Sequence, residues 1–394
     1  MALPVDSGSF ERLAVAAADR APVSGATHTF YRYPARFSPR FASAAIEGFT
    51  RTGDVVLDPY MGGGTSIVEG MRLGRVMLGN DLNSLALFVT RVKITTLSTR
   101  EITDIKRWAE QRIGGFGYRV PRRNVAALLD SPKLRNMNLP RARFIKKIMA
   151  AAISASNDLN TLRAREFVRC AILRTGQWAL DGRATHTSLW EFRAKLAAHI
   201  RTMLEDIATY AGEIGRHPHC PAPVLRQGDA ASIAEEGVLT DWRGRVSLVV
   251  TSPPYPGVHV LYHRWQVDGR RETAAPYWVT DCPDGQGASY YNFGDRREEN
   301  LDGYFATSLR TLLAVRRMLR TGGWMVQMVA FSDPDTQLPR YLANMDAAGF
   351  AEVLIQSAGG SGRIWRIVPG RKWHAALRGH TTSAREVVLV HRAV

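Results

Sequence analysis

Cysteine is scarce in this sequence, and its scarcity excludes several kinds of protein. The three cysteines, Cys170, Cys220 and Cys282, lie far apart without C-x-x-C spacing, which argues against a disulfide framework or a zinc ribbon. His217 and His219 lie close to Cys220, but no fourth ligand is evident, so this stretch is interpreted as a polar loop. We therefore expect no metal site.

Long apolar runs are also missing. No stretch of about 18 apolar residues is present to cross a bilayer. The N-terminal stretch contains Asp6, Glu11 and Asp19, and it lacks the charged head and apolar core of a signal peptide. The sequence therefore predicts a soluble cytoplasmic protein with no membrane partner.

Acidic residues are few relative to basic ones. The chain has 36 Asp and Glu against 52 Lys and Arg, a formal net charge of +16. Between Arg100 and Arg216 there are 22 basic and 11 acidic residues, so the middle of the chain carries most of the excess. A polyanion such as nucleic acid is the natural partner of such a surface; membrane headgroups and simple solubility are the alternatives.

Hydrophobic patterning predicts an α/β protein: a mostly parallel sheet of about seven strands with helices on both faces, interrupted by a helical insertion. Residues 1–95 and 222–394 are expected to form the α/β domain, and 96–221 the basic helical insertion. The pair Gly322-Gly323 is expected to end a helix that begins near Tyr304. Strands are expected at 55–57, 75–79, 224–227, 246–251, 324–329, near 353 and at 387–391.

A glycine-rich turn follows the first expected strand. Residues 58–65 read D-P-Y-M-G-G-G-T, and glycines after a strand allow positive φ angles and close approach of a ligand to the backbone. The pattern matches neither the P-loop nor G-x-G-x-x-G. Asp81 ends the next strand, a position from which a carboxylate accepts both hydroxyls of a ribose. These features favour a bound cofactor over a tight turn with a helix-capping Asp.

A second unusual turn reads S-P-P-Y over residues 252–255, directly after the strand 246–251. The two prolines have no N–H, so the carbonyls of Ser252 and Pro253 are expected to point outward as rigid acceptors. Acceptors of this kind suit a substrate with an NH₂ group, such as the amino nitrogen of cytosine or adenine, and Tyr255 is expected to stack on the base. The alternative is that the segment is only a turn. A base inside a duplex must be flipped out to reach such a pocket.

Together these residues resemble a known family. D-P-Y-M-G-G-G-T resembles the cofactor motif D-P-F-x-G-x-G-T of the amino-group DNA methyltransferases, and T-S-P-P-Y over 251–255 resembles their catalytic motif. H-T-F-Y-R-Y-P-A-R-F over 28–37 and G-D-A over 228–230 are similar to two further elements of the family. The resemblance implies a Rossmann-like sheet, S-adenosylmethionine as cofactor, and cofactor contacts from Tyr33, Phe37, Asp58, Pro59, Tyr60, Gly62, Gly64, Thr65, Asp81 and Asp229.

The resemblance implies methyl transfer to an exocyclic amine of double-stranded DNA, with the catalytic residues Ser252, Pro253, Pro254 and Tyr255. The Ser form of the motif favours cytosine N4, and adenine N6 is the alternative. A nucleic-acid-binding module without catalysis is the third hypothesis. Cytosine C5 chemistry requires a Pro-Cys nucleophile, and here only the reverse order, Cys-Pro, occurs. A cognate restriction endonuclease and a bacterial, archaeal or phage origin are consistent with the family.

The basic insertion lies where one class of these enzymes carries its target-recognition region. Residues 256–300 form a long stretch rich in aromatic residues, interpreted as a lid over the flipped base, and 363–378 as a second clamp. Lys and Arg in these regions are expected mainly to contact phosphates. The candidates for DNA binding are Arg119, Arg122, Arg123, Arg141, Arg143, Lys146, Lys147, His263, Arg264, Arg371 and Lys372.

Overall fold

A computed structural model of the chain describes residues 7–33, 37–118, 122–183, 185–256, 264–269, 271–285, 293, 298, 301–355, 361–367 and 385–394. Four of the DNA-binding candidates, Arg119, His263, Arg371 and Lys372, lie outside these residues. Within them, no helix is both long enough and apolar enough to cross a membrane.

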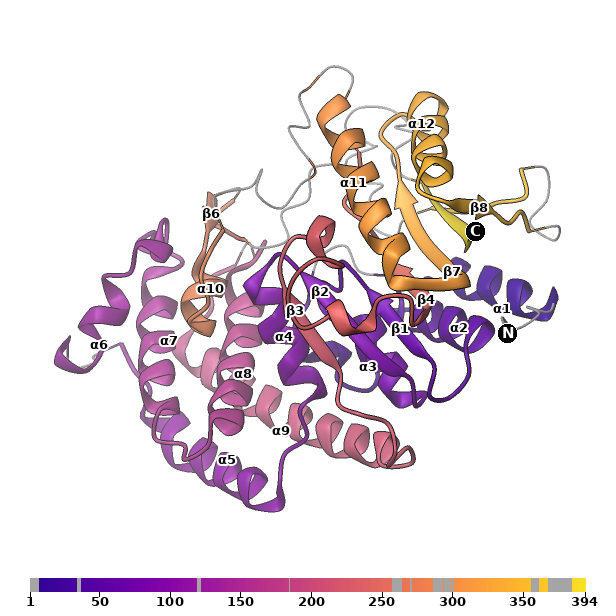
Figure 1. Cartoon of the computed structure of the whole chain (residues 1–394). Helices are drawn as coiled ribbons and strands as arrows, with labels where there is room; N and C mark the ends of the chain where they lie inside the picture. Colours follow the sequence, from indigo (N-terminus) through magenta and orange to yellow (C-terminus); the bar gives the residue numbers. More distant parts are fainter. Residues whose placement is uncertain are drawn as a thin grey trace.

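A single sheet of eight strands forms the centre of the α/β part (Figure 1). Seven strands follow the spatial order β3-β2-β1-β4-β7-β10-β8, and β9 pairs with β10. From β3 to β7 neighbours are parallel, and β10 is antiparallel to β7, β8 and β9. The strands are β1 (Val55–Asp58), β2 (Val76–Asp81), β3 (Val224–Gln227), β4 (Val246–Thr251), β7 (Leu319–Ala330), β8 (Phe350–Glu352), β9 (Ile364–Ile367) and β10 (Arg385–Ala393).

Helices cover both faces of this sheet, so its central strands are buried and mainly apolar. All six residues of β4 are buried, as expected for a parallel strand between two helical layers. One face packs against α1 (Ser7–Ala18), α2 (Pro39–Phe49) and α3 (Thr65–Arg72), and the other against α11 (Asp302–Met318) and α12 (Pro334–Ala347). This arrangement confirms the predicted Rossmann-like fold.

The alternation along β4 shows how the two layers are held. Leu248 and Val250 pack with Phe41 and Ile46 of α2, while Val249 packs with Val315 of α11 on the opposite face. Each fully buried side chain of this kind contributes about 1.5–3 kcal/mol relative to its exposed state.

The middle of the chain forms a helical body beside the β3 edge of the sheet (Figure 1). The helix α4 (Ser84–Ile94) follows β2 and packs against both the sheet and this body. Two helices of the body begin with capping boxes, Ser98 with Glu101 and Ser188 with Glu191. The helices are α5 (Thr99–Arg112), α6 (Arg122–Leu129), α7 (Arg143–Ser156), α8 (Leu162–Leu180) and α9 (Leu189–Ile214).

A segment from beyond the catalytic motif also belongs to the helical body. The strands β5 (Trp265–Val267) and β6 (Arg271–Thr273) form a small antiparallel hairpin, and α10 (Ala275–Thr280) packs against α8. Trp265, Tyr277 and Trp278 are buried in the core of the helical body. These three aromatic side chains are therefore part of a core, whereas the sequence interpretation assigned their segment to a lid.

The pair Gly322-Gly323, which was expected to end a helix, has a different role in the structure. Gly322 and Gly323 lie inside β7, which begins at Leu319, and do not end the preceding helix. The register against β4 shifts between Val246 and Leu248 at this place, and Gly322 has a φ of 73°. The pair therefore forms a bulge in the strand, a common use of glycine that a helix-stop pattern does not distinguish.

Candidate active site

The glycine turn between β1 and α3 is shaped by close contacts with the protein itself. Gly62 and Gly64 have φ values of 48° and 73°, which favour glycine. A Cβ atom on Gly63 would lie 2.7 Å from Cβ of Tyr33, and one on Gly64 would lie 2.6 Å from Oγ1 of Thr90. The glycines are thus required by packing, in addition to the predicted approach of a ligand.

Asp81 lies beside the glycine turn, at the end of β2. Its carboxylate accepts hydrogen bonds from the N–H groups of Gly62 and Asn83, each at 2.8 Å. Burial raises the pKa of Asp81 to about 6, against the effect of these two hydrogen bonds. The side chain remains partly exposed beside three residues without side chains, so the groups present fit the ribose of a nucleoside cofactor. Its contact with the cofactor stays a prediction.

Asp58 connects the glycine turn to the proline turn, residues 252–255. Its side chain is buried and accepts hydrogen bonds from Thr251 Oγ1 at 2.7 Å, from Ser66 Oγ and from the N–H of Tyr60. Burial raises its pKa to about 6, and these hydrogen bonds oppose the rise. These contacts give Asp58 a role in holding β1, α3 and β4 together; a contact with the cofactor stays a prediction.

The segment between α1 and α2 lies against the glycine turn. The hydroxyl of Tyr33 accepts a hydrogen bond from Asn83 Nδ2 at 3.1 Å, and its ring lies beside Gly62 and Gly63. Phe37 is buried, with its ring centroid 5.5 Å from that of Phe41. Tyr33 therefore lies against the glycine turn, whereas Phe37 packs on α2, and a contact of either residue with the cofactor stays a prediction.

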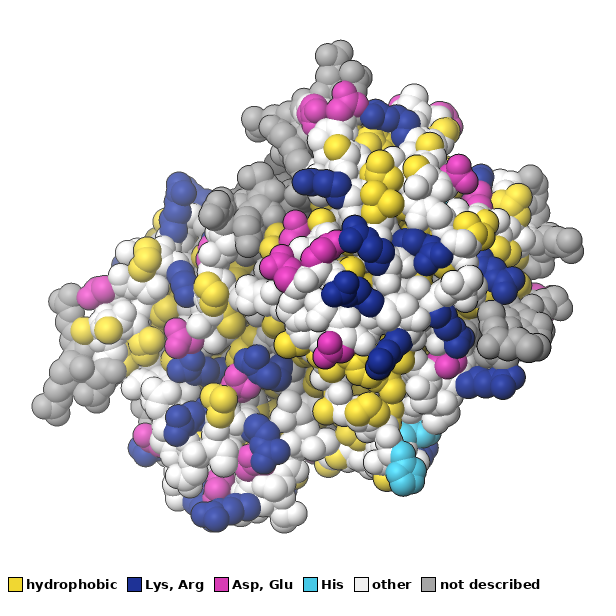
Figure 2. Space-filling model, in the orientation of Figure 1, with side chains coloured by type: hydrophobic (Ala, Val, Ile, Leu, Met, Phe, Trp, Pro, Cys, Tyr) yellow, Lys and Arg dark blue, Asp and Glu magenta, His cyan; other side chains and the backbone are white. Residues whose placement is uncertain are grey.

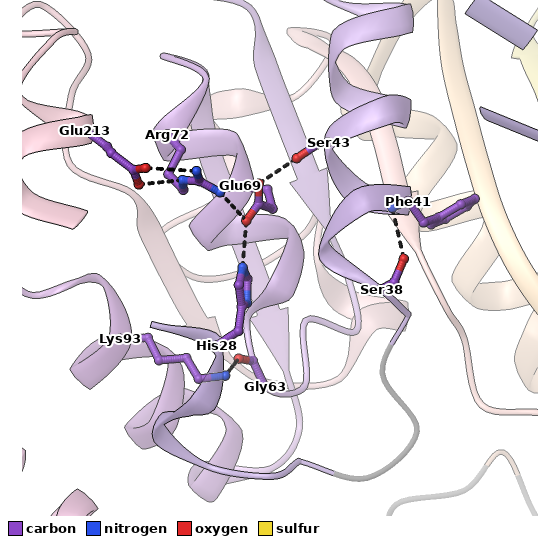
Figure 3. A network of polar contacts seen from close by, with 9 residues as sticks. All are labelled: His28, Ser38, Phe41, Ser43, Gly63, Glu69, Arg72, Lys93 and Glu213. Carbon is purple, nitrogen blue, oxygen red and sulfur yellow. Dashed lines mark hydrogen bonds and ion pairs between the residues drawn. The ribbon is translucent and has the colours of Figure 1, made fainter. Parts of the chain in front are cut away.

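A buried polar network fixes this segment to α3 (Figure 3). Glu69 accepts from His28 Nε2 at 2.6 Å, from Ser43 Oγ at 2.5 Å and from Arg72, and Arg72 also pairs with Glu213 of α9 at 2.6 Å. Burial raises the pKa of Glu69, but the hydrogen bond and charge of His28 outweigh it, so the pKa lies below its ordinary value. This network links the sheet to the helical body.

Lys93 was not foreseen as part of this region. Its side chain is fully buried on α4, and its Nζ donates to the carbonyl of Gly63 at 2.6 Å (Figure 3). A lysine four residues after the buried Val89, at a position where helical spacing calls for an apolar residue, is a signal that the sequence does carry. Lys93 therefore fixes the glycine turn to α4.

The remaining cofactor candidates lie around the same turn. The carbonyl of Pro59 accepts from Asn80 Nδ2 at 3.1 Å, and the Tyr60 ring lies 5.6 Å from that of Phe293. Thr65 is buried at the start of α3. Asp229 is exposed after β3, where its carboxylate accepts from the N–H of Ala231 at 2.9 Å.

The proline turn begins directly after β4. Ser252 Oγ lies 2.9 Å from the hydroxyl of Tyr255, which donates to Glu386 at 2.9 Å. The carbonyl of Pro254 accepts from the hydroxyl of Tyr304 at 2.7 Å, which fixes the turn to α11. Tyr255 is 8% exposed, so most of its ring is covered, and its stacking on a base stays a prediction.

The two turns lie at the same edge of the sheet. β1 and β4 are parallel neighbours, with Val56 opposite Leu248 and Leu57 opposite Val249, so their carboxyl ends meet. The hydrogen bond from Thr251 to Asp58 joins the residues at those ends. Open α/β sheets bind their ligands at this edge, between strands that lead to opposite faces.

The DNA-binding candidates differ in their accessibility. Arg141, Arg143 and Lys147 are exposed, whereas Lys146 is buried and donates to Asn138. Burial lowers the pKa of Lys146, and the charge of Lys147 lowers it further. Lys146 in this position does not fit a phosphate contact, because a buried ammonium is not available to DNA.

Other candidates are paired or not described. Arg264 is 20% exposed and pairs with Asp284 at 2.8 Å, while Arg141 lies 3.5 Å from Asp268. Arg122 and Arg123 begin α6, and their side chains are not among the described features. Figure 2 shows Lys and Arg over both the sheet part and the helical body, so basic surface is not confined to the insertion.

Metal binding has no support in the part of the chain that the structure describes. Across those residues, no group of three or more His, Cys, Asp or Glu side chains is arranged to hold a metal ion. All three cysteines are free, and Cys170 is buried.

Known proteins resemble parts of this chain. A family model described as DNA methylase matches residues 18–87. The type II methyltransferase M.MvaI of Kocuria varians is 33% identical over 87 residues, which cover 20% of this chain and 19% of that protein. M.MjaII of Methanocaldococcus jannaschii is 26% identical over 78 residues, or 20% and 15% of the two chains. The matches thus span less than a fifth of these relatives' own length.

Among solved structures, the crystal structure of TrmN from Thermus thermophilus aligns with 90% of this chain and 49% of that one, at 11% identity and a TM-score of 0.33. The strand order described above carries the fold assignment. The family match covers the segment with Tyr33, the glycine turn and Asp81, and it supports S-adenosylmethionine as the cofactor. Residues 18–87 of the chain are thus similar to the family described as DNA methylase, and this similarity covers a minor part of the chain.

Proposed function

We propose that the protein transfers a methyl group from S-adenosylmethionine to the exocyclic N4 amine of cytosine in DNA. The observation that carries the proposal is the pairing of two turns at one sheet edge. The glycine turn offers backbone and the Asp81 carboxylate to a nucleoside, and the Ser252–Tyr255 turn offers acceptors to an amine. Asp58 joins them through Thr251 and Ser66.

When bound, S-adenosylmethionine supplies a methyl group attached to a positively charged sulfur, and this sulfur is the leaving group when the amine attacks the methyl carbon in line. The residues of the chain orient the acceptor amine: Ser252 Oγ and the Pro253 carbonyl accept its N–H groups, which favours a more tetrahedral and more nucleophilic nitrogen. Alignment of this kind supplies a large part of the acceleration of such displacements. As the bond from nitrogen to methyl carbon forms and the carbon–sulfur bond breaks, one N–H proton leaves to water.

Cytosine is favoured over adenine by Ser252. The adenine enzymes more often have Asp at this place, and the Ser form is typical of the cytosine enzymes. Adenine N6 on the same scaffold is therefore the second candidate. A module that binds nucleic acid without catalysis is disfavoured, because both turns are intact and buried polar groups tie them together.

DNA is the proposed substrate, with the target base flipped out of the duplex. The exposed basic residues Arg141, Arg143 and Lys147 lie on the helical body, which is proposed as the target-recognition region. Phosphate contacts from such residues give affinity that falls as salt rises. A cognate restriction endonuclease is a partner consistent with the type II relatives.

The function is tested by incubating the protein with labelled S-adenosylmethionine and mixed-sequence DNA, and identifying the modified nucleoside by mass spectrometry. N4-methylcytosine is the expected product. N6-methyladenine alone would overturn the cytosine assignment, and no product on any DNA or RNA would favour the binding module. Ser252→Ala should lower kcat by about 10–100-fold with little change in cofactor affinity.

The DNA-binding role of the helical body is tested by a matched pair on α7. Lys147→Ala should weaken DNA binding a few-fold and reduce the slope of log affinity against log salt by about one, because an exposed phosphate contact is lost. Lys146→Ala should lower stability and leave the salt slope unchanged, since this side chain is buried on Asn138. Equal slopes for Lys147→Ala and the wild type would contradict the role of Lys147.

A further inference from the structure

A chain of hydrogen bonds runs behind the catalytic turn and ends in a carboxylate. Ser252 Oγ lies 2.9 Å from the hydroxyl of Tyr255, and that hydroxyl lies 2.9 Å from Oε1 of Glu386. Glu386 is the second residue of β10, more than 130 positions after the turn. No sequence pattern connects these residues.

Glu386 is held in place by an ion pair that leaves one of its oxygens for the turn. On the neighbouring strand β9, Arg366 lies directly opposite, and its Nε donates to Oε2 of Glu386 at 2.7 Å. The side chain of Glu386 is 7% exposed and that of Arg366 is 10% exposed. A buried carboxylate requires a partner of this kind, because an uncompensated charge is costly to bury. Arg366 engages Oε2, and Tyr255 engages Oε1.

The direction of each hydrogen bond in the chain follows from the groups involved. An ionised carboxylate only accepts, so the single hydrogen of the Tyr255 hydroxyl points to Glu386. The Tyr255 oxygen then accepts from Ser252, whose own hydrogen is used for that bond. Toward a substrate, Ser252 Oγ can therefore only accept.

We infer that Glu386 is a positioning residue that acts through Tyr255 and makes Ser252 an obligate hydrogen-bond acceptor. The inference rests on the proposed function and specifies how a neutral serine replaces the aspartate of related enzymes. An aspartate accepts by virtue of its own charge, whereas here the charge lies two hydrogen bonds away. An N–H of a cytosine or adenine amine matches this acceptor, and a carbonyl oxygen, as at position 4 of thymine, opposes it.

The test compares Glu386→Gln and Tyr255→Phe with the wild type in steady-state methylation of DNA. The amide of Gln can donate to Tyr255, which allows the whole chain to reverse; Phe removes the chain, keeps the ring and leaves the ion pair with Arg366 intact. Each variant should lower kcat about tenfold while KM for S-adenosylmethionine stays within about twofold. The double variant should lose no more than either single one, because both break the same chain.

Two further variants separate this role from a structural one. Glu352→Gln breaks a comparable ion pair, with Arg363 at 2.6 Å, that has no contact with the turn, so kcat should stay within twofold of the wild type. Ser252→Asp carries its own charge, so adding Glu386→Gln to it should cost less than twofold.

The outcomes distinguish this inference from the proposed function. Absence of methylation by the wild type on any nucleic acid would end the proposed function. If the wild type is active, turnover of both Glu386→Gln and Tyr255→Phe within twofold of the wild type would overturn the inference, as would a further multiplicative loss in the double variant.

Discussion

The two turns at the sheet edge differ in what they lack: the glycine turn lacks side chains, and the proline turn lacks N–H donors. The turn after β1 has no side chains at its three glycines, and Tyr33, Thr90 and Lys93 pack directly against its backbone there. The turn after β4 lacks N–H donors at its two prolines, and it is held by its side chains and carbonyls through Tyr304 and Glu386. A missing Cβ allows close approach, and a missing donor leaves only acceptors.

This difference indicates how each turn should respond to change. The glycine turn depends on space, so added atoms should damage it most. The proline turn depends on the direction and position of hydrogen bonds, so removing single hydroxyls should alter turnover more than folding. Asp58 belongs to both, through Ser66 on one side and Thr251 on the other.

The largest effect is expected from adding one methyl group to the glycine turn. Gly64→Ala places a Cβ 2.6 Å from Thr90 Oγ1 at a φ of 73°, so it should lower the free energy of unfolding by about 2–4 kcal/mol and abolish S-adenosylmethionine binding. Gly53→Ala is the control: its φ is 85°, but a Cβ there meets nothing within 4 Å. It should cost about 1–2 kcal/mol and retain cofactor affinity.

Denaturant unfolding and calorimetric titration with the cofactor measure these two variants. If Gly64→Ala behaved like Gly53→Ala in both measurements, backbone strain alone would explain the cost, and the close packing of the turn would be unimportant.

A second, pH-dependent effect is expected at the residue shared by the turns. The pKa of Asp58 is raised from an ordinary 3.8 to about 6, so its contribution to stability is fully present below pH 4 and is lost as the pH rises through 6. Asp58→Asn removes this loss of stability with rising pH. Relative to the wild type, the variant should gain up to about 3 kcal/mol between pH 4 and pH 7.

Chemical denaturation of both proteins at several pH values gives this difference. Asp81 also has a raised pKa, but it is present in both proteins, so its effect on the difference in stability largely cancels. A difference between the two proteins that does not change with pH would show that Asp58 is not buried as a charged group.

The smallest effect is expected from removing one hydroxyl behind the proline turn. Tyr304→Phe deletes the bond to the Pro254 carbonyl and should cost about 1 kcal/mol of stability and lower kcat several-fold. Tyr341→Phe deletes a buried hydroxyl bonded at 2.7 Å to the side chain of Gln327, which belongs to β7 and not to the turn. It should cost a similar stability and leave kcat unchanged; equal kcat values for the two variants would contradict a role of Tyr304 in positioning the turn.

Most of the sheet could be predicted from the sequence because buried parallel strands are short apolar runs between turns. The bounds of β3 and β4 agree with the predicted ranges 224–227 and 246–251, since each strand is delimited by clear turn residues. The bulge at Gly322 and the packing of Trp265 could not be predicted in this way. Both depend on which strand or helix lies opposite, and local patterns do not contain that information.

The site was predictable to the same extent. Residues that follow strand ends in a parallel sheet meet at one edge, so the glycine turn, Asp81 and Ser252 were placed together correctly. Glu69 and Glu386 were missed because each is a single charged residue, and their partners His28 and Tyr255 lie 41 and 131 positions away, respectively. Lys146 was taken as a surface residue because one basic residue next to another carries no sign of burial.

The helical body is completed by two segments that lie on either side of the catalytic turn in the chain. Its core contains Trp265 and Tyr277 as well as the helices α5 to α9, and Tyr277 donates to Asn83 at the start of α4. Exchange of 96–221 alone, by recombination or in the laboratory, would leave these aromatic residues without their packing partners. A chimaera with a new specificity would have to inherit both segments together.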